Sequence, residues 1–234
     1  MLNSLRSNLS LDARADAVEM LDSGDLSAAE IERNLADLAR LNRLPGGTAT
    51  SIAAVERLVG PMSSPRILDV GTGCGDIPLA FARRGWPTVG VDANPEVLAI
   101  AMRRTADEPA IELVAADARA LPFDDGAFDV AHCSLLLHHL DPHDAVRTLC
   151  ELGRVSTRGV VINDLRRGVL PLVATWASIV AFGRSPVTRH DGLVSARRAY
   201  TLDELDSLIA RAGLLRRWRS NRWMPRVVTA AVAP

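Results

Sequence analysis

The stretch RILDVGTGCGDIPLAFARRG, residues 66–85, places three glycines at alternate positions between an apolar run and an amphipathic one. The run ILDV is typical of a buried strand, and the segment after the third glycine is typical of a helix. Glycine has no Cβ, so it adopts positive φ angles and lets a ligand approach the backbone closely. Gly71, Gly73 and Gly75 therefore predict a tight strand-to-helix turn, which either only closes the backbone or also binds a ligand.

The pattern that follows this turn predicts the fold class. Short apolar runs with little alternation are separated by amphipathic stretches, as a parallel sheet covered on both faces requires. The chain is therefore expected to form a doubly wound α/β sheet. The expected strands are 67–70, 88–91, 111–116, 128–133 and 159–164, and the expected helices lie near 76–84, 95–105 and 143–154.

The C-terminal region predicts a change of strand direction. A capped helix over 201–214 is followed by two β-rich runs, LLRRWRSNRW and RVVTAAVA, with only Met224 and Pro225 between them. A parallel crossover needs a dozen or more residues, so these two strands must be antiparallel. The expected fold is a mostly parallel, seven-stranded, Rossmann-like sheet with an antiparallel last strand.

Two helical segments are expected to cap this sheet. Residues 1–60 form an N-terminal helical cap, with one helix over 25–41 and a second ending at Gly60, and 61–234 form the main domain. Ser27, three residues before Glu30, predicts a capping box for the first helix. Residues 166–200 are an insertion of the length typical of a substrate lid, expected to close an apolar pocket holding Trp176. The alternative is a second helix packed on the sheet edge.

Composition limits the partners. The 27 basic and 28 acidic residues give a net charge of −1, so no global field attracts nucleic acid or anionic lipid. Three widely spaced cysteines build neither a disulfide framework nor a zinc knuckle, which is typical of a cytoplasmic protein. We also expect the protein to be soluble and to hold no metal. The longest apolar run, 169–182, is shorter than the roughly 20 residues that a membrane span needs. Whether the chain forms a homodimer is left undecided by its sequence. The C-terminal arginines are expected to form a solvated face: Arg211, Arg216, Arg217, Arg219, Arg222 and Arg226.

Acidic residues stand at three predicted strand tips. The GxGxG spacing is neither the GxGxxG of dinucleotide dehydrogenases nor a P-loop. Asp69 precedes the turn, where it would repel a pyrophosphate and favour a cationic ligand. Asp92, which follows the second strand, is placed to accept from ribose hydroxyls, and Asp117, after the third, to accept from an exocyclic amine.

The series ILDVGTGCGDIPLAFA, GVDANPEVLAIA and AADARALPFDDGAFDVAHCSLLLHHL resembles the class I S-adenosylmethionine-dependent methyltransferases. The resemblance covers residues 66–165 and is strongest to the small-molecule group that includes ubiquinone and menaquinone biosynthesis enzymes. It implies S-adenosylmethionine as cofactor, with the methionine part at 69–75, the ribose at Asp92 and the adenine at Asp117 and the backbone of Ala118. The expected cofactor-binding residues are Asp69, Gly71, Thr72, Gly73, Gly75, Asp92, Ala93, Asp117, Ala118 and Ser134.

The resemblance also narrows the methyl acceptor. Enzymes that methylate base or amide nitrogens carry [ND]PP[YF] after the fourth strand, where this chain reads CSLLLHHL. The region after residue 165 resembles, more loosely, methyltransferases of natural-product pathways. We therefore expect a small, partly apolar acceptor methylated on oxygen, such as a phenol or an acid, with carbon methylation as the alternative.

Histidines near the strand tips are the candidate general bases. A phenol or acid must lose its proton, and histidine has the best-matched pKa for accepting it. His139 and His190 are expected ahead of His138, although any of them could instead pack or cap. In the segment RHDG, His190 and Asp191 form an alternative acid–base pair, unless Arg189 and Asp191 form an ordinary ion pair.

Two other classes of function are also compatible with the sequence motifs. The same strand tips suit a nicotinamide-dependent oxidoreductase, although the glycine spacing is wrong for one. A non-catalytic module that only binds S-adenosylmethionine would also carry these motifs. Turnover of the bound cofactor separates such a module from an enzyme.

Overall fold

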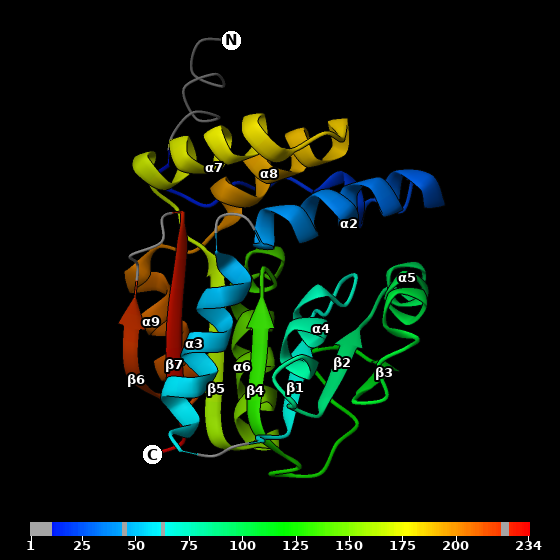
Figure 1. Cartoon of the computed structure of the whole chain (residues 1–234). Helices are drawn as coiled ribbons and strands as arrows, with labels where there is room; N and C mark the ends of the chain where they lie inside the picture. Colours follow the sequence, from blue (N-terminus) through cyan, green and yellow to red (C-terminus); the bar gives the residue numbers. More distant parts are fainter. Residues whose placement is uncertain (1–10, 44–45, 62–63, 221–224) are drawn as a thin grey trace.

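The computed structural model describes residues 11–43, 46–61, 64–220 and 225–234. They form a seven-stranded, mostly parallel sheet, as predicted, and its strand order is β3-β2-β1-β4-β5-β7-β6 (Figure 1). Strands β1 to β5 pair in parallel, whereas β7 is antiparallel to both of its neighbours. The strands are β1 Ile67–Val70, β2 Thr88–Asp92, β3 Ile111–Ala115, β4 Phe128–Ser134, β5 Ser156–Leu165, β6 Leu215–Ser220 and β7 Arg226–Val232.

Three of the helices begin at a side-chain cap that the sequence supplies. Asn94 accepts hydrogen bonds from the first turn of α5, and Asp141 does the same for α6, each followed by a proline. Thr201 and Glu204 form a full capping box at α9. The helices are η1 Met20–Asp22, α2 Ala28–Arg43, α3 Gly47–Val59, α4 Asp76–Ala82, α5 Pro95–Thr105, η2 Leu137–His139, α6 Pro142–Val155, α7 Val169–Phe182, α8 Pro186–Arg198 and α9 Leu202–Arg211.

Two sequence predictions need correction in these elements. The capping box of α2 is only half formed, because the Ser27 hydroxyl donates to the Glu30 carboxylate instead of accepting from the Glu30 backbone. The first C-terminal strand ends at Ser220, and the remainder of the predicted run, 221–223, lies outside the described residues.

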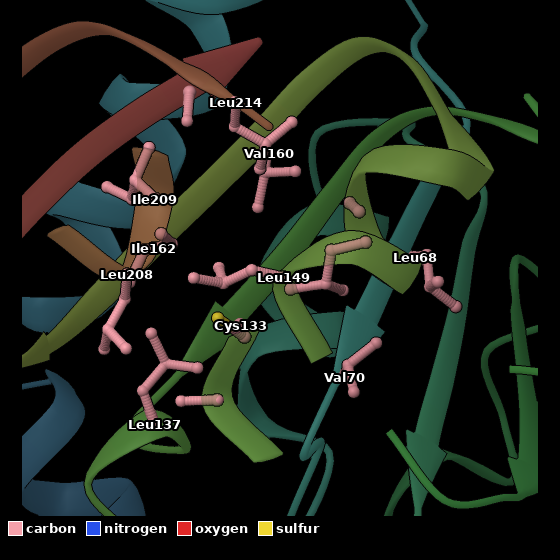
Figure 2. Close-up of a cluster of buried hydrophobic side chains, with 14 of the residues drawn as sticks. Leu68, Val70, Cys133, Leu137, Leu149, Val160, Ile162, Leu208, Ile209 and Leu214 are labelled. Carbon is pink, nitrogen blue, oxygen red and sulfur yellow. The ribbon is translucent and has the colours of Figure 1, made fainter. Parts of the chain in front are cut away.

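The sheet is buried on both faces, which explains its near-continuous apolar strands. Alternate strand residues such as Leu68, Cys133 and Ile162 pack against α6 and α9, where Leu149 and Leu208 meet them (Figure 2). The intervening residues, among them Ile67, Val130 and Val161, face α3 and α4 on the other side, where they meet Val55 and Phe81.

Helices α2, α7 and α8 lie across the edge of the sheet where the parallel strands end (Figure 1). Helix α3 instead packs on a face of the sheet against β5 and β7. The expectation that Trp176 lies inside a pocket under this cover is wrong, since Trp176 is 54% exposed on α7. Within the described residues, none of the helices is long and apolar enough to cross a bilayer.

Candidate functional site

The glycine turn has the backbone that its sequence predicts. Gly71, Gly73 and Gly75 have φ angles of 71°, 55° and 77°, a region that disfavours other residues. A Cβ at Gly73 would meet no atom within 4 Å, because this glycine borders open space. The amides of Gly71 and Thr72 both donate to the Val91 carbonyl, which fixes the turn beside β2. A ligand can therefore approach the backbone at Gly73.

Asp69 lies at this turn but its carboxylate is already engaged. It is 1% exposed, with Oδ1 lying 2.6 Å from Nδ1 of His132 and Oδ2 accepting from the Thr72 hydroxyl at 2.8 Å. His132 in turn lies 2.8 Å from the Ser51 hydroxyl through Nε2. Asp69 therefore supports the turn from beneath and supplies negative potential, while its oxygens are held by protein groups.

Two further carboxylates face the cavity at the turn. Asp92 ends β2 and accepts from the amides of Gly73 and Asn94 at 2.9 and 3.0 Å. Asp76 begins α4 and accepts from the Asn42 side chain at 3.0 Å. Burial raises the pKa of both carboxyl groups. Each retains lone pairs that can accept from a ligand.

These groups line one cavity along the ends of β1, β2 and β4, closed on its outer side by α2 and η1. The acidic groups of Asp69, Asp76 and Asp92 are complementary to the positively charged and hydroxyl-bearing parts of S-adenosylmethionine, so the residues present fit this cofactor. Eight of the ten predicted cofactor residues line it: Asp69, Gly71, Thr72, Gly73, Asp92, Ala93, Ala118 and Ser134.

The other two predicted cofactor residues, Gly75 and Asp117, lie outside this lining. Gly75 faces away, with an added Cβ only 2.9 Å from Thr105. Asp117 points to the surface, where both carboxylate oxygens accept from Arg119, whose other end pairs with Asp144. The hydrogen bonds from Arg119 hold the pKa of Asp117 at about 2. Its neighbours Ala116 and Ala118 line the cavity instead.

A second cavity adjoins the first, between the sheet edge and helices η1, α2, α7 and α8. The two share Leu21, Leu38, Leu135 and His139 in their walls. Leu135, at the end of β4, has a φ of 54°, an unusual conformation for a branched residue and one that concentrates at functional sites. The rest of the lining of the second cavity mixes nine polar side chains with apolar residues: Glu19, Asn34, Leu41, His138, Leu165, Thr175, Ser178, Ile179, Thr188, Asp191, Gly192, Ser195, Pro225 and Arg226.

His138 is the best-oriented histidine in this cavity. Its Nδ1 lies 2.6 Å from Oδ1 of Asp164, at the end of β5. The charge of His138 and its hydrogen bond outweigh burial and lower the pKa of Asp164, so this carboxylate is ionised and accepts the Nδ1 proton. Backbone carbonyl contacts with Arg14 and Arg198 anchor the residue. With Nδ1 bonded to Asp164, Nε2 is the ring nitrogen left to accept a proton from a ligand.

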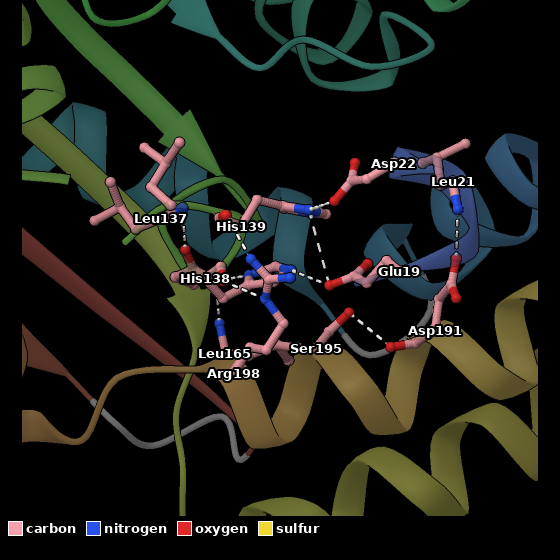
Figure 3. Close-up of polar contacts among 12 residues, drawn as sticks. Glu19, Leu21, Asp22, Leu137, His138, His139, Leu165, Asp191, Ser195 and Arg198 are labelled. Carbon is pink, nitrogen blue, oxygen red and sulfur yellow. Dashed lines mark hydrogen bonds and ion pairs between the residues drawn. The ribbon is translucent and has the colours of Figure 1, made fainter. Parts of the chain in front are cut away.

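His139 and Glu19 also line the second cavity. Nδ1 of His139 lies 2.8 Å from Oδ2 of Asp22 and 3.8 Å from Oε1 of Glu19 (Figure 3). Although burial opposes it, the Asp22 hydrogen bond and the Glu19 charge raise the pKa of His139 to about 9. Glu19 is 3% exposed, and its Oε1, also 3.8 Å from Nε2 of His138, has no hydrogen-bond partner.

The three side chains Glu19, His138 and His139 bring one ligand atom each within 4.8 Å, the donor set of a divalent cation site. The His139 nitrogen in this set already shares a proton with Asp22. The absence of a metal from this protein therefore stays a prediction.

His190 lines neither cavity. It is exposed on α8, 2.8 Å from Asp191. Asp191 itself is buried and accepts from the backbone amides of Met20 and Leu21 at 2.8 and 3.1 Å. The expected ion pair between Arg189 and Asp191 is not formed, because the carboxylate is used to hold η1 against α8.

Arg226 contradicts the prediction of a solvated C-terminal arginine face. It begins β7, is 8% exposed and reaches the second cavity. It donates to the side chain oxygen of Asn42 and, at 3.4 Å, to the Ser134 hydroxyl. Burial lowers its pKa to about 10, so it stays charged near neutral pH. Among the described residues, Arg216 and Arg219 do lie at the surface, paired with Asp206.

Several site residues were missed by the sequence analysis. Asp76 follows the glycine turn directly, and Asp164 stands at the tip of the fifth strand, so position alone could have indicated both. Glu19, Asn42 and Arg226 lie far from any motif and reach the site only through folding. No local sequence signal distinguishes them from surface residues.

Comparison with known proteins agrees with this geometry. Residues 67–159 match the family model described as a methyltransferase domain. The demethylmenaquinone methyltransferase of Clavibacter sepedonicus is 37% identical over 123 residues, 51% of this chain and 49% of that protein. A ubiquinone/menaquinone biosynthesis C-methyltransferase of Geobacter sp. (strain M21) is 32% identical over 122 residues, 49% of this chain and 51% of that protein. The match thus spans about half the length of these relatives.

A solved structure extends the likeness in fold. The magnesium protoporphyrin IX methyltransferase of Synechocystis PCC 6803, determined with bound S-adenosylhomocysteine, superposes with a TM-score of 0.59 at 18% identity. The superposition covers 81% of this chain and 84% of that one. The sheet order, the cavity at the glycine turn and the family match leave no support for a nicotinamide-dependent oxidoreductase. Residues 67–159 of this chain thus match a methyltransferase domain, and the chain is similar to class I S-adenosylmethionine-dependent methyltransferases of the ubiquinone and menaquinone type.

Proposed function

We propose that this protein transfers the methyl group of S-adenosylmethionine to an oxygen of a small, partly apolar acceptor bound in the second cavity. The observation that carries this proposal is the Asp164–His138 pair, which opens into the second cavity next to the wall shared with the cofactor cavity. An acceptor there would lie between a general base and the cofactor, as an in-line transfer requires.

In the cavity at the glycine turn, here called the cofactor cavity, different residues would contact different parts of the cofactor. Asp92 would accept from the ribose hydroxyls, and the backbone around Gly73 would lie against the methionine part. Asp76, held by Asn42, would accept from the methionine ammonium, while Ala116 and Ala118 would flank the adenine. When bound, the cofactor supplies an electrophilic methyl group on a sulfonium.

The protein's own contribution to the reaction is position and proton transfer. Nε2 of His138 would take the acceptor's hydroxyl proton as the oxygen–methyl bond forms and the methyl–sulfur bond breaks, and Asp164 would stabilise the resulting imidazolium. The leaving group would be neutral S-adenosylhomocysteine. For a phenol of pKa near 10, unassisted deprotonation at neutral pH is unfavourable by about 4 kcal/mol. A positioned histidine typically contributes 10²- to 10⁴-fold to such a step.

The other two candidate bases are less suited to this role. With a pKa of about 9, His139 is protonated near neutral pH and cannot accept a proton. It can instead balance the charge of Glu19, whose unpartnered Oε1 would accept a hydrogen bond from the acceptor. His190 is exposed and outside both cavities. The expectation that ranked these two ahead of His138 is therefore revised in this proposal.

Carbon methylation is the second candidate, favoured by the printed activity of the Geobacter relative, a C-methyltransferase. The same residues serve it, because removing a phenolic proton at His138 makes the neighbouring ring carbon nucleophilic. The position of an isotopically labelled methyl group in the product, read by NMR, separates the two outcomes.

Two measurements test the proposal. Titration calorimetry should show binding of S-adenosylhomocysteine, and mass spectrometry of ligand retained by the purified protein should guide a screen of phenols and acids for methyl transfer. With an acceptor in hand, His138→Ala should lower kcat at least tenfold with unchanged S-adenosylhomocysteine affinity, and should remove the acidic limb of the pH–rate profile. His190→Ala is the matched control and should change neither value.

Other outcomes decide against the proposal. Tight binding of S-adenosylhomocysteine without turnover of any acceptor would identify a binding module instead. If His138→Ala keeps normal kcat and the same acidic limb, no base acts at this position.

A further inference from the structure

The outer face of α7 is the most apolar exposed surface among the described residues. Five of its large side chains are more than half exposed, whereas large exposed hydrophobic residues elsewhere occur singly or in pairs. They recur at helical spacing, so they form one stripe along the helix. The stripe consists of Val169, Leu170, Val173, Trp176 and Val180, with exposures of 68%, 65%, 55%, 54% and 59%. The opposite side of α7, including Thr175 and Ile179, lines the second cavity.

The surroundings of this stripe are basic. Helix α7 has no charged residue, whereas the turn that follows it carries Arg184 and α8 carries Arg189, Arg197 and Arg198. Residues 166–198 contain six arginines and one acidic residue, Asp191, which is buried and occupied by the amides of Met20 and Leu21. Arg184 and Arg189 are exposed, and Arg197 lines a shallow hollow with Trp176. The whole chain carries a net charge of −1, so this cationic character is local.

We propose that the α7 stripe docks the protein on the surface of an anionic lipid bilayer. An apolar helix face with a tryptophan and flanking arginines matches the acyl and headgroup layers of such a surface. At 14 residues, α7 is too short to span the bilayer and would lie in its plane. Docking would place the second cavity, on the other side of the same helix, directly beneath the membrane surface.

A second copy of the chain is a poorer occupant. A 14-residue helix is about 21 Å long and about 10 Å wide, so its face covers roughly 200 Å². A stable protein interface needs roughly 800 Å² from each partner. A two-fold interface would also bring the same arginines of both copies together, which repels.

Vesicle flotation of the full chain tests this inference. We expect binding to vesicles of phosphatidylcholine with 30% phosphatidylglycerol at low salt, weaker binding to phosphatidylcholine alone, and a blue shift of tryptophan emission on binding. The double variant Val173→Ser/Trp176→Ser should reduce partitioning at least tenfold while S-adenosylhomocysteine binding is unchanged. Arg184→Gln/Arg189→Gln should reduce mainly the dependence on phosphatidylglycerol.

Met102→Ser/Leu215→Ser is the matched control, because these side chains are similarly exposed, 50% and 57%, but lie on α5 and β6. The inference is overturned if the wild type binds neither vesicle, or if the control loses as much binding as the α7 variant. It is also overturned if light scattering shows a dimer that the α7 variant dissociates in the absence of lipid. None of these results bears on methyl transfer, which is measured separately with a water-soluble acceptor.

Discussion

At the residue scale, His139 makes the folded state sensitive to alkaline pH. Its folded pKa of about 9 lies above the ordinary value of about 6.5, so its pairing with Asp22 stabilises the fold fully below pH 6.5. That stabilisation is lost as the pH rises through 9. We expect a loss of about 1 to 2 kcal/mol in the free energy of unfolding, less than the shift alone implies, because Asp22 is 41% exposed and solvent screens the pair.

Urea denaturation between pH 6 and 9.5 measures this loss, and Asp22→Asn should remove most of it. NMR titration should place the pKa of His139 lower in the variant than in the wild type. Equal pH slopes for the two proteins would show that Asp22 does not hold the charged imidazole.

Gly73 and Gly85 form a matched pair that separates backbone strain from ligand contact. Both have positive φ, 55° and 75°, and a Cβ at either would meet no atom within 4 Å. Only Gly73 lines the cofactor cavity. Each valine substitution should destabilise the fold by about 1 to 3 kcal/mol through strain. In calorimetry, Gly73→Val should weaken S-adenosylhomocysteine binding at least tenfold and Gly85→Val should not. Equal affinities would mean that the glycine turn is not the cofactor cradle.

At the scale of elements, Asp191 ties η1 to α8. Its buried carboxylate accepts from the amides of Met20 and Leu21, and η1 carries Asp22 beside the site. Asp191→Ala leaves both donors unpaired, so we expect about 2 to 4 kcal/mol of destabilisation. The pKa of His139 should also fall, as NMR can show, because Asp22 is no longer held beside it.

The exposed neighbour provides the control for this tie. His190→Ala should change stability by less than about 0.5 kcal/mol and leave the pKa of His139 unaltered. If Asp191→Ala lowers stability but not that pKa, η1 is positioned by other contacts, such as the hydrogen bond from Arg198 to the Ala17 carbonyl just before it.

At the scale of the whole molecule, the cofactor cavity joins elements that are distant in sequence. Its walls come from η1, α2 and the ends of β1, β2 and β4, so a bound ligand stabilises all of them together. Free S-adenosylhomocysteine at 100 times its Kd should raise the free energy of unfolding by about 2.7 kcal/mol. Hydrogen exchange should slow at residues 20–42 and in the glycine turn, and less at β6 and β7. Protection confined to 69–92 would show that α2 and η1 do not close on the ligand.

The sequence determined the sheet because local patterns encode its elements. Apolar runs and caps such as Asn94 and Thr201 specify the strands and most of the helices within a few residues, and the short C-terminal connection forces the antiparallel pair. The glycine turn and Asp92 were also predictable, because parallel strands bring their carboxyl ends to one edge and the loop geometry is local. Eight of the ten predicted cofactor residues line the cavity for this reason.

Only the tertiary structure decided which polar groups face the acceptor. Glu19 and Arg226 come from opposite ends of the chain, and their burial depends on how α2, α7 and α8 pack over the sheet edge. The same packing leaves Trp176 exposed on the outer side of α7. Side-chain direction at such positions is set by long-range packing and by the cost of leaving a buried charge without partners, and neither is visible in local sequence.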